Sequence, residues 1–227
     1  MKKITPFVSW FVTLLIPLAV IMLGVRLLMT PLFLEMEYRM PGFPDDQFGF
    51  GMQDRLTWAK PSVEYLVNNA DISFLGDLKF ANGKPIYNER ELSHMADVKM
   101  VVQKLLIDWY VDILILAILG LLAWYSGWWF DYLMGWKRGG FLTIGLLVAM
   151  GVFASTSFWD FFAWFHSLFF SGNSWLFEYS DTLIRLFPIR LWEDAVAYIG
   201  GFSLLLGILL GFGLKPRDKQ GVNSKEH

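Results

Sequence analysis

The sequence contains no cysteine, and this absence excludes several kinds of chemistry at once. Without a thiol the chain can form no disulfide, no thiolate metal site and no cysteine nucleophile. Charge is also scarce, because Asp, Glu, Lys and Arg make up 18% of the 227 residues, against about a quarter in ordinary soluble domains. The formal net charge of −2 gives no indication of a nucleic-acid partner. Histidine occurs three times, so imidazole chemistry is confined to three positions.

Hydrophobic residues make up 55% of the chain and gather in four long stretches. A helix that spans a bilayer needs about 20 mostly apolar residues. We predict spans at about Phe7–Met29, Trp109–Phe130, Phe141–Phe158 and Ala195–Leu214. The first is expected to be an uncleaved signal anchor, because its apolar run is too long for a signal peptide and no small-x-small cleavage site follows. Four such stretches predict an integral membrane protein.

The distribution of lysine and arginine predicts the orientation of the spans, since short cytoplasmic flanks carry these residues in excess. Basic residues flank the first span, occupy the second connection and follow the last span: Lys2, Lys3, Lys137, Arg138, Lys215, Arg217, Lys219 and Lys225. The third connection holds more acidic than basic residues. Both termini are therefore predicted to be cytoplasmic, and residues 30–108 and 159–194 to lie outside.

The predicted fold class is an all-α polytopic membrane protein with four transmembrane helices and a small α+β extracytoplasmic cap. Along the chain we expect a signal-anchor span (1–29), an extracytoplasmic segment (30–108), a three-span bundle with an outer loop at 159–194 (109–214), and a polar cytoplasmic tail (215–227). Within the cap, Asn82-Gly83 between two short apolar alternations predicts a β-hairpin. Asn88 as N-cap with Glu91 three residues later predicts the start of a helix that runs on into the second span.

Two histidines fall in the two outer segments, whereas His227 belongs to the tail. His94 shares one helix side with Glu91 and Asp97, three residues away in either direction. His166 lies in the aromatic run WDFFAWFHSLFF, where an imidazole needs a partner or a function. Two interpretations stay open at this point: a functional pair, or a hydrogen-bonded interface histidine and a solvated helix histidine.

The sequence has no G-x-S-x-G motif, so no acyl-enzyme nucleophile is visible. Two imidazoles can instead act as general base and general acid, because their ordinary pKa lies near neutral pH. A second option is a metal site, since histidine and carboxylate suit zinc. The candidate ligands are Glu91, His94, Asp97 and His166, although E-x-x-H-x-x-D is not a recognised metal signature.

Three charged residues inside or beside the spans are further candidates. Arg26 lies near the outer end of the first span, where it can snorkel to the interface or bind a lipid carbonyl or phosphate. Arg185 follows Asp181 at i+4 and could serve only to pair with it. Asp112, at the start of the second span, could form a polar site under the outer leaflet.

Several strings of the chain resemble those of the lipoprotein intramolecular transacylase family, which comprises four-span bacterial membrane proteins. The similar strings are YNERELSHMADVK, FHSLFFSGNSWLF continuing through DTLIRLFP, and LWEDA. The resemblance covers the first span and about Leu78 to Ala195, is weak between Met36 and Asn69, and is absent from the tail.

The resemblance implies an enzyme of the bacterial plasma membrane that acts at the outer leaflet. Its substrate would be a diacylglyceryl-modified lipoprotein among membrane lipids, and no cofactor or metal is implied. The enzyme would move the sn-2 acyl chain to the amine of the N-terminal cysteine, forming a lyso-form lipoprotein. His94 and His166 match the family's two essential histidines. Candidates for orienting, oxyanion-stabilising or substrate-binding roles are Glu91, Asp97, Arg26, Asn173, Trp175 and Arg185.

Two other functions remain open on the sequence alone. A non-catalytic membrane scaffold or partner-binding subunit would not depend on either histidine. A metal-dependent membrane hydrolase would require bound zinc. The sequence makes no prediction of the oligomeric state.

Overall fold

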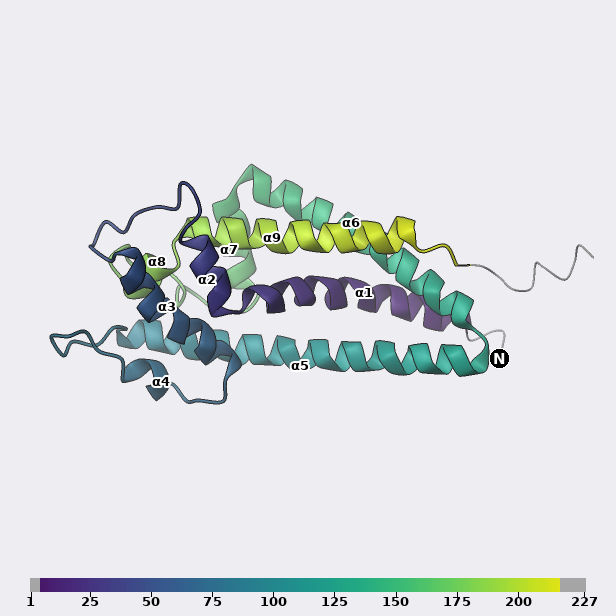
Figure 1. The fold of residues 1–227 in the computed structure, drawn as a ribbon, viewed down its shortest axis with the longest axis horizontal. Coiled ribbons are helices and arrows are strands. Elements are labelled where there is room, and N and C mark those ends of the chain that lie inside the picture. The colour runs from purple at the N-terminus through teal and green to yellow at the C-terminus, as the bar shows by residue number, and fades with distance from the viewer. Residues whose placement is uncertain (1–4, 217–227) are drawn as a thin grey trace, which may run out of the picture. The chain divides into compact units, whose positions relative to one another are not determined.

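A computed structural model describes residues 5–216, and nearly all of its regular structure is helical. The elements in chain order are α1 (Thr5–Leu28), α2 (Pro31–Glu37), α3 (Met52–Val67), α4 (Ser73–Gly76), α5 (Glu89–Ser126), α6 (Trp129–Thr156), α7 (Phe158–Ser167), α8 (Thr182–Leu186), α9 (Ile189–Ile208) and the π-helical turn η1 (Leu209–Gly213) (Figure 1). The basic flank Lys2 and Lys3, and the predicted tail beyond residue 216 with His227, lie outside the described residues.

Four helices are long and apolar enough to cross a membrane. They are α1, α5, α6 and α9 with η1, and their span segments are Pro6–Leu28, Glu89–Ser126, Trp129–Thr156 and Ile189–Gly213. The prediction of four spanning helices is therefore confirmed. The predicted helix that begins after Asn88 and continues into the second span is also confirmed, since α5 is one helix of 38 residues.

The predicted connection between the second and third spans is wrong in its position. The chain reverses at Gly127, whose φ of +77° is a conformation that glycine adopts without strain. Lys137 and Arg138 consequently lie within α6 and not in a loop. The helix accommodates Arg138 because its guanidinium stacks 4.8 Å from the ring centroid of Trp10 and donates to Ser9 Oγ at 3.4 Å.

One compact unit, which we call the glycine-packed unit, contains the described residues of 1–24, 108–152 and 200–227. Glycines of α6 allow close helix contacts, as small residues do in membrane helices. A Cβ atom at Gly139 would lie 2.5 Å from Cβ of Ile16, and a Cβ at Gly140 would lie 2.7 Å from the carbonyl oxygen of Gly207. The α6 backbone therefore approaches both α1 and α9 more closely than any larger residue would permit.

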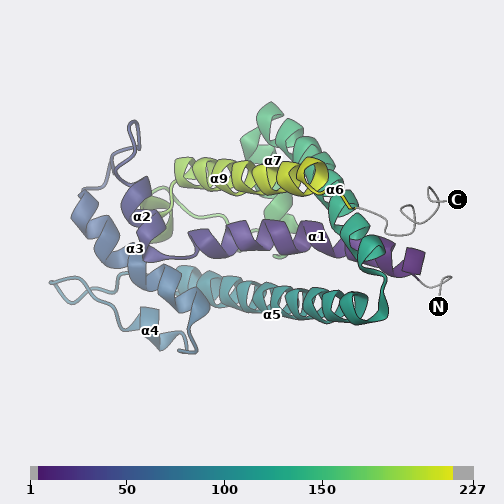
Figure 2. The ribbon, with the colours of Figure 1, turned by 45° about the vertical axis from the view of Figure 1, so that its right-hand side comes forward.

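The second compact unit, which we call the histidine-bearing unit, contains residues 25–107 and 153–199. In this unit α3 contacts α2, α4 and α8, and both views show α2, α3 and α4 near the first turns of α5 (Figures 1 and 2). Tyr38 fastens α2 to α8, because its hydroxyl donates to the carbonyl of Leu186 at 2.8 Å. The core consists of Phe33, Leu34, Tyr38, Leu56, Ala59, Tyr65, Leu75, Ile86, Tyr87, Met95, Leu183, Leu186, Leu191 and Ala195.

The predicted α+β cap is wrong, because no strand forms within residues 5–216. The Asn82-Gly83 turn is present, with Gly83 at φ +80° and the Lys84 N–H donating to Asn82 Oδ1 at 3.0 Å. Pairing stops at a single antiparallel bridge between Lys79 and Pro85. Proline has no N–H to extend the ladder, and an isolated two-stranded hairpin is marginal in any case.

One buried carboxylate joins the start of α5 to α8. Glu91 accepts the backbone N–H of Asn88 at 2.7 Å, and the Asn88 side chain accepts the Glu91 N–H at 3.0 Å, which confirms the predicted capping box. The other carboxylate oxygen of Glu91 accepts the N–H of Leu183 in the first turn of α8 at 2.7 Å. Thr182 adds a second link, since its hydroxyl donates to the Ile86 carbonyl at 2.6 Å. These bonds fix the first turns of the helix that carries His94.

Candidate active site

His166 lies in the last turn of α7, a short helix that begins after Ser157. The Ser157 hydroxyl caps the helix by accepting the N–H of Asp160 at 3.2 Å. The imidazole Nδ1 lies 2.8 Å from the carbonyl oxygen of Phe162. A carbonyl only accepts, so Nδ1 must carry the hydrogen, and Nε2 of the neutral ring is left with a free lone pair. This tautomer is suited to taking up a proton at Nε2.

Aromatic side chains surround the His166 ring. Its centroid lies 4.1 Å from that of Phe162 and 4.7 Å from that of Trp175. Burial lowers the pKa of His166, and the hydrogen bond to Phe162 partly opposes this shift. His166 is therefore neutral at neutral pH, which is the protonation state a general base requires.

His94 lies in the second turn of α5 and is buried between two phenylalanine rings. The ring centroids of Phe170 and Phe177 lie 5.1 and 5.3 Å from that of His94. Its Nδ1 atom is buried and has no hydrogen-bond partner within the described part of the chain. A buried polar nitrogen without a partner is costly and is not explained by packing alone.

Phe170 brings the two histidines together. Its ring contacts His94 and also lies 5.8 Å from the centroid of His166. The histidines are close enough for a charge on His166 to act on His94. Two imidazoles from α5 and α7, 72 positions apart in the sequence, therefore share one aromatic neighbour.

The segment that follows α7 is held over His94 by Arg90. The Arg90 guanidinium donates to the Leu176 carbonyl at 2.7 Å and stacks 5.5 Å from the ring centroid of Phe177. Because Arg90 lies one turn before His94 on the same helix, it fixes the covering segment relative to the imidazole.

A cavity of about 320 Å³ lies between residues of α5 and the segment that follows α7. Its lining residues are Asp97, Met100, Val101, Phe169, Phe170, Ser171 and Ser174. Phe170 contacts both imidazoles and also lines this cavity, so the cavity and the histidine pair share this residue. Asn173 lies on the exposed turn next to the lining residue Ser174.

The predicted metal-ligand set is not assembled. Both carboxylate oxygens of Glu91 accept backbone N–H groups, so Glu91 connects the start of α5 to α8. Across residues 5–216, no group of three or more His, Asp or Glu side chains is arranged to hold a metal ion.

Arg185 contacts Asp46, Phe48 and Phe50, and its ion pair differs from the sequence expectation. It forms an ion pair with Asp46, with Nη2 2.8 Å from Oδ2, and not with Asp181. Its guanidinium also lies 3.5 Å from the ring centroid of Phe50. Burial raises the pKa of Asp46. The hydrogen bonds from Arg185 and from the Phe50 N–H together lower this pKa by more than burial raises it, so the net shift is downward.

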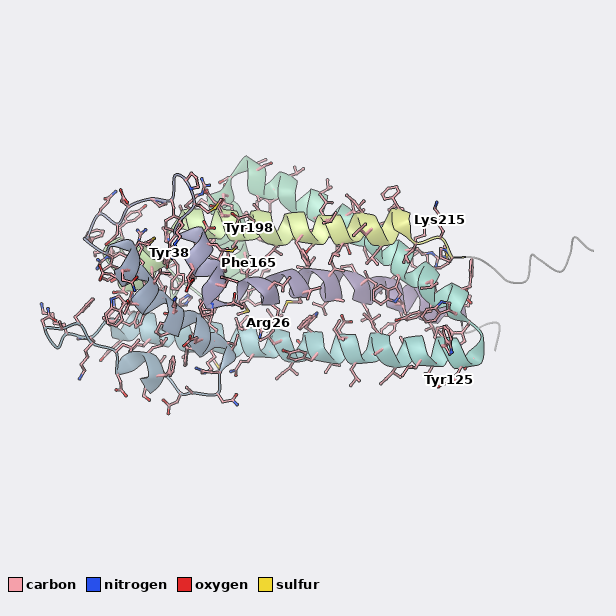
Figure 3. All side chains as sticks on the ribbon, viewed as in Figure 1. Arg26, Tyr38, Tyr125, Phe165, Tyr198 and Lys215 are labelled. Carbon is pink, nitrogen blue, oxygen red and sulfur yellow. The ribbon has the colours of Figure 1, made fainter. Side chains whose placement is uncertain are left out.

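The remaining predicted polar residues are not brought to the histidine pair by any contact in residues 5–216. Arg26 lies half-buried in the last turn of α1, at the end that leads to α2 (Figure 3). Asp112 belongs to the glycine-packed unit, where both of its carboxylate oxygens are buried without a hydrogen-bond partner among the described residues.

Sequence reasoning missed Glu37, which is almost wholly buried at the end of α2. Three groups of α9 interact with it: the Asp194 carboxylate, the Arg190 guanidinium and the Tyr198 hydroxyl. Burial and the neighbouring Asp194 carboxylate raise the pKa of Glu37 to about 7, and Arg190 opposes this rise. The segment around Glu37 offered no sequence signal, because a single glutamate in MEYRMPGF does not reveal its burial.

Substitution of Glu37 by glutamine is expected to stabilise the protein at pH 8 but not at pH 4.5. The folded-state pKa of about 7 exceeds the ordinary value of 4.5. The wild type therefore loses stability as the pH rises through this window, whereas the amide has no proton to lose. We expect the Tm at pH 8 to rise by about 2–4 °C, measured by thermal unfolding in detergent.

The matched variant Glu64→Gln removes an exposed carboxylate and should show no such gain. Equal Tm values for Glu37→Gln and wild type at pH 8 would contradict the prediction.

Comparison with known proteins identifies relatives along most of the chain. The family model described as lipoprotein intramolecular transacylase Lit matches residues 10–192. An uncharacterized protein of Aquifex aeolicus (strain VF5) is 30% identical over 205 residues, which cover 90% of this chain and 92% of the relative.

Solved structures show the same fold. The structure of the membrane integral lipoprotein intramolecular transacylase Lit from Bacillus cereus has a TM-score of 0.64 and 20% identity, covering 92% of this chain and 94% of that chain. A variant of that protein with a histidine-to-arginine substitution has a TM-score of 0.58 at 20% identity, covering 92% and 89% of the two chains.

Proposed function

The chain belongs to the lipoprotein intramolecular transacylase family and is a multi-pass membrane enzyme, and from this premise we propose its reaction. The substrate is a diacylglyceryl-modified lipoprotein, and the sn-2 acyl chain moves from glycerol to the amine of the N-terminal cysteine. The observation that carries this proposal is the meeting of His94 and His166 at Phe170.

In the proposed reaction His166 shuttles the proton. Its Nε2 takes a proton from the substrate amine as nitrogen attacks the sn-2 carbonyl carbon, and a C–N bond forms. The ester C–O bond then breaks, and the same proton passes to the glycerol oxygen. The hydrogen bond from Nδ1 to the Phe162 carbonyl supports this role, because it leaves Nε2 free and stabilises the protonated ring.

His94 is proposed to stabilise the oxyanion of the tetrahedral intermediate by donating from Nε2. Its buried Nδ1 has no hydrogen-bond partner among the described residues. A hydrogen on Nδ1 would therefore be a buried donor without an acceptor, so the neutral ring carries its hydrogen on Nε2. Asn173, Trp175 and Asp97 are proposed to position the substrate, since they lie on or beside the two segments that carry the histidines. Arg26 is proposed to bind a lipid carbonyl or phosphate.

The reaction needs no nucleophile from the enzyme. Amine and ester belong to one molecule, and well-oriented intramolecular reactions reach effective molarities on the order of 10⁵–10⁸ M. The absence of cysteine and of a serine elbow in the chain is consistent with this route. We further propose that both termini are cytoplasmic, so that the histidine-bearing unit acts at the outer leaflet.

The test is conversion of a synthetic diacylglyceryl-cysteine lipopeptide by the purified full-length protein. Because the product is an isomer of the substrate, its mass does not change. Tandem mass spectrometry is expected to locate one acyl chain on nitrogen, and the peptide should lose its reactivity with amine-labelling reagents. A wild-type protein that is folded and leaves the amine free would overturn the proposal.

A further inference from the structure

We propose that the cavity beside Phe170 binds the α-ammonium group of the substrate and that Asp97 is its counter-ion. This inference rests on the proposed function, since it assigns the place where the attacking nitrogen is held before it loses its proton.

Asp97 is the anionic group of this cavity. It is half-buried on α5, one turn after His94, and interacts electrostatically with the His94 imidazole. The nearby Lys99 is engaged elsewhere, because its ammonium donates to Asn68 Oδ1 at 3.1 Å and also to the Ala70 carbonyl. Arg90 is bound to the Leu176 carbonyl. The Asp97 carboxylate is therefore available to a cation from outside the chain.

The remaining lining suits an amine at the start of a peptide. The hydroxyls of Ser171 and Ser174 can accept hydrogen bonds from an ammonium, and Met100 and Val101 provide an apolar wall. At about 320 Å³ the cavity lies at the small end of the range for ligand pockets. It is large enough for the cysteine amine and its neighbouring atoms, but too small for a whole acyl chain.

The cavity and the proton acceptor share one neighbouring residue. Phe170 lines the cavity, and its ring contacts both His94 and His166. The ammonium held by Asp97 first releases one proton to solvent. The neutral amine then attacks the ester, and Nε2 of His166 takes the second proton from nitrogen and passes it to the glycerol oxygen. Asp97 is assigned to binding the ammonium group, so it is a substrate-binding residue and not a proton carrier.

The experiment compares two lipopeptides that differ only at the amine: one free and one N-acetylated. At pH 7 the free α-amine is mostly protonated, since its ordinary pKa is about 8. The wild-type protein should bind the free-amine form more tightly at pH 7 and lose this preference at pH 9.5. The variant Asp97→Asn, which keeps the volume but not the charge, should lose the preference at both pH values. Its KM should rise by about 10-fold to 100-fold, with a smaller change in kcat.

Two further variants control for charge and folding. Glu89→Gln removes an exposed carboxylate from the first turn of the same helix and should behave as wild type. Asp97→Glu keeps the charge and should retain the preference for the free amine. If Asp97→Asn binds the free amine at pH 7 with the wild-type preference, the inference is overturned, whatever the turnover. If wild type does not convert the lipopeptide but shows the Asp97-dependent preference, the proposed function fails while the amine site stands.

Discussion

Replacement of His166 by alanine is expected to lower the rate of acyl transfer by about 10²–10⁴-fold, the usual contribution of a positioned general base. The Nδ1 hydrogen bond to Phe162 aligns this ring, and Nε2 is left as the proton acceptor. The variant His166→Asn keeps a donor near the Nδ1 position but has no atom at Nε2. It should therefore be as inactive as His166→Ala, as measured by the rate of amine loss from the lipopeptide.

His94 offers a matched pair of substitutions that separates packing from chemistry. The imidazole lies between Phe170 and Phe177, so His94→Phe retains an aromatic ring in that position whereas His94→Ala removes it. If His94 acts on the oxyanion, both variants should lose activity by about 10²–10³-fold. Recovery of activity in His94→Phe would show a packing role only. Full activity in the alanine variants of both histidines would exclude a catalytic role for the pair.

Substitution of Gly139 by valine is expected to destabilise the glycine-packed unit severely. The first added atom would lie 2.5 Å from Cβ of Ile16, an atom too close to the α1 backbone to move aside. Overpacking costs about 1–3 kcal/mol and occasionally more. At this contact distance we expect the upper end of that range, which corresponds to a decrease in Tm of about 6–12 °C in a chain of this size.

The same helix provides the control for this prediction. A Cβ atom at Gly145 would have no heavy atom within 4 Å, apart from its own chain neighbours and helix backbone. Gly145→Val makes the same chemical change in α6 and should leave the Tm of the detergent-solubilised protein nearly unchanged. Equal Tm values for the two variants would show that close approach of α6 to α1 does not depend on the glycine.

Local sequence signals predicted the elements that depend on neighbouring residues. Hydropathy alone predicts four spanning helices, and the Asn88–Glu91 capping box predicts where α5 begins. The errors arise where partners are far apart in the sequence. The sequence predicts a loop at Arg138 because basic residues gather in short connections, but α6 contains Arg138, which stacks on Trp10 of another helix. Arg185 was matched with Asp181 by helical spacing, but its partner is 139 residues away at Asp46.

The candidate site was predictable only in part, for a similar reason. His94 and His166 stand out because imidazoles are rare in this chain and both fall in predicted outer segments. Phe170, which contacts both, is one of 21 phenylalanines and carries no distinguishing sequence pattern. The helical spacing of Glu91 and His94 suggests that Glu91 acts on the imidazole. In the structure Glu91 instead accepts the N–H of Leu183 in α8, a contact that the local sequence does not indicate.

The double attachment of Glu91 determines how this region can open. One carboxylate accepts N–H groups from the start of α5 and from the first turn of α8. Fraying of α5 therefore leaves the Leu183 N–H without its acceptor, and fraying of α8 leaves one Glu91 oxygen without its donor. Local unfolding in proteins proceeds in cooperative units whose members lose their hydrogen bonds together. The start of α5, with His94 on it, and α8 therefore form a single such unit. Their amide hydrogens should become accessible to solvent in one event and not in two.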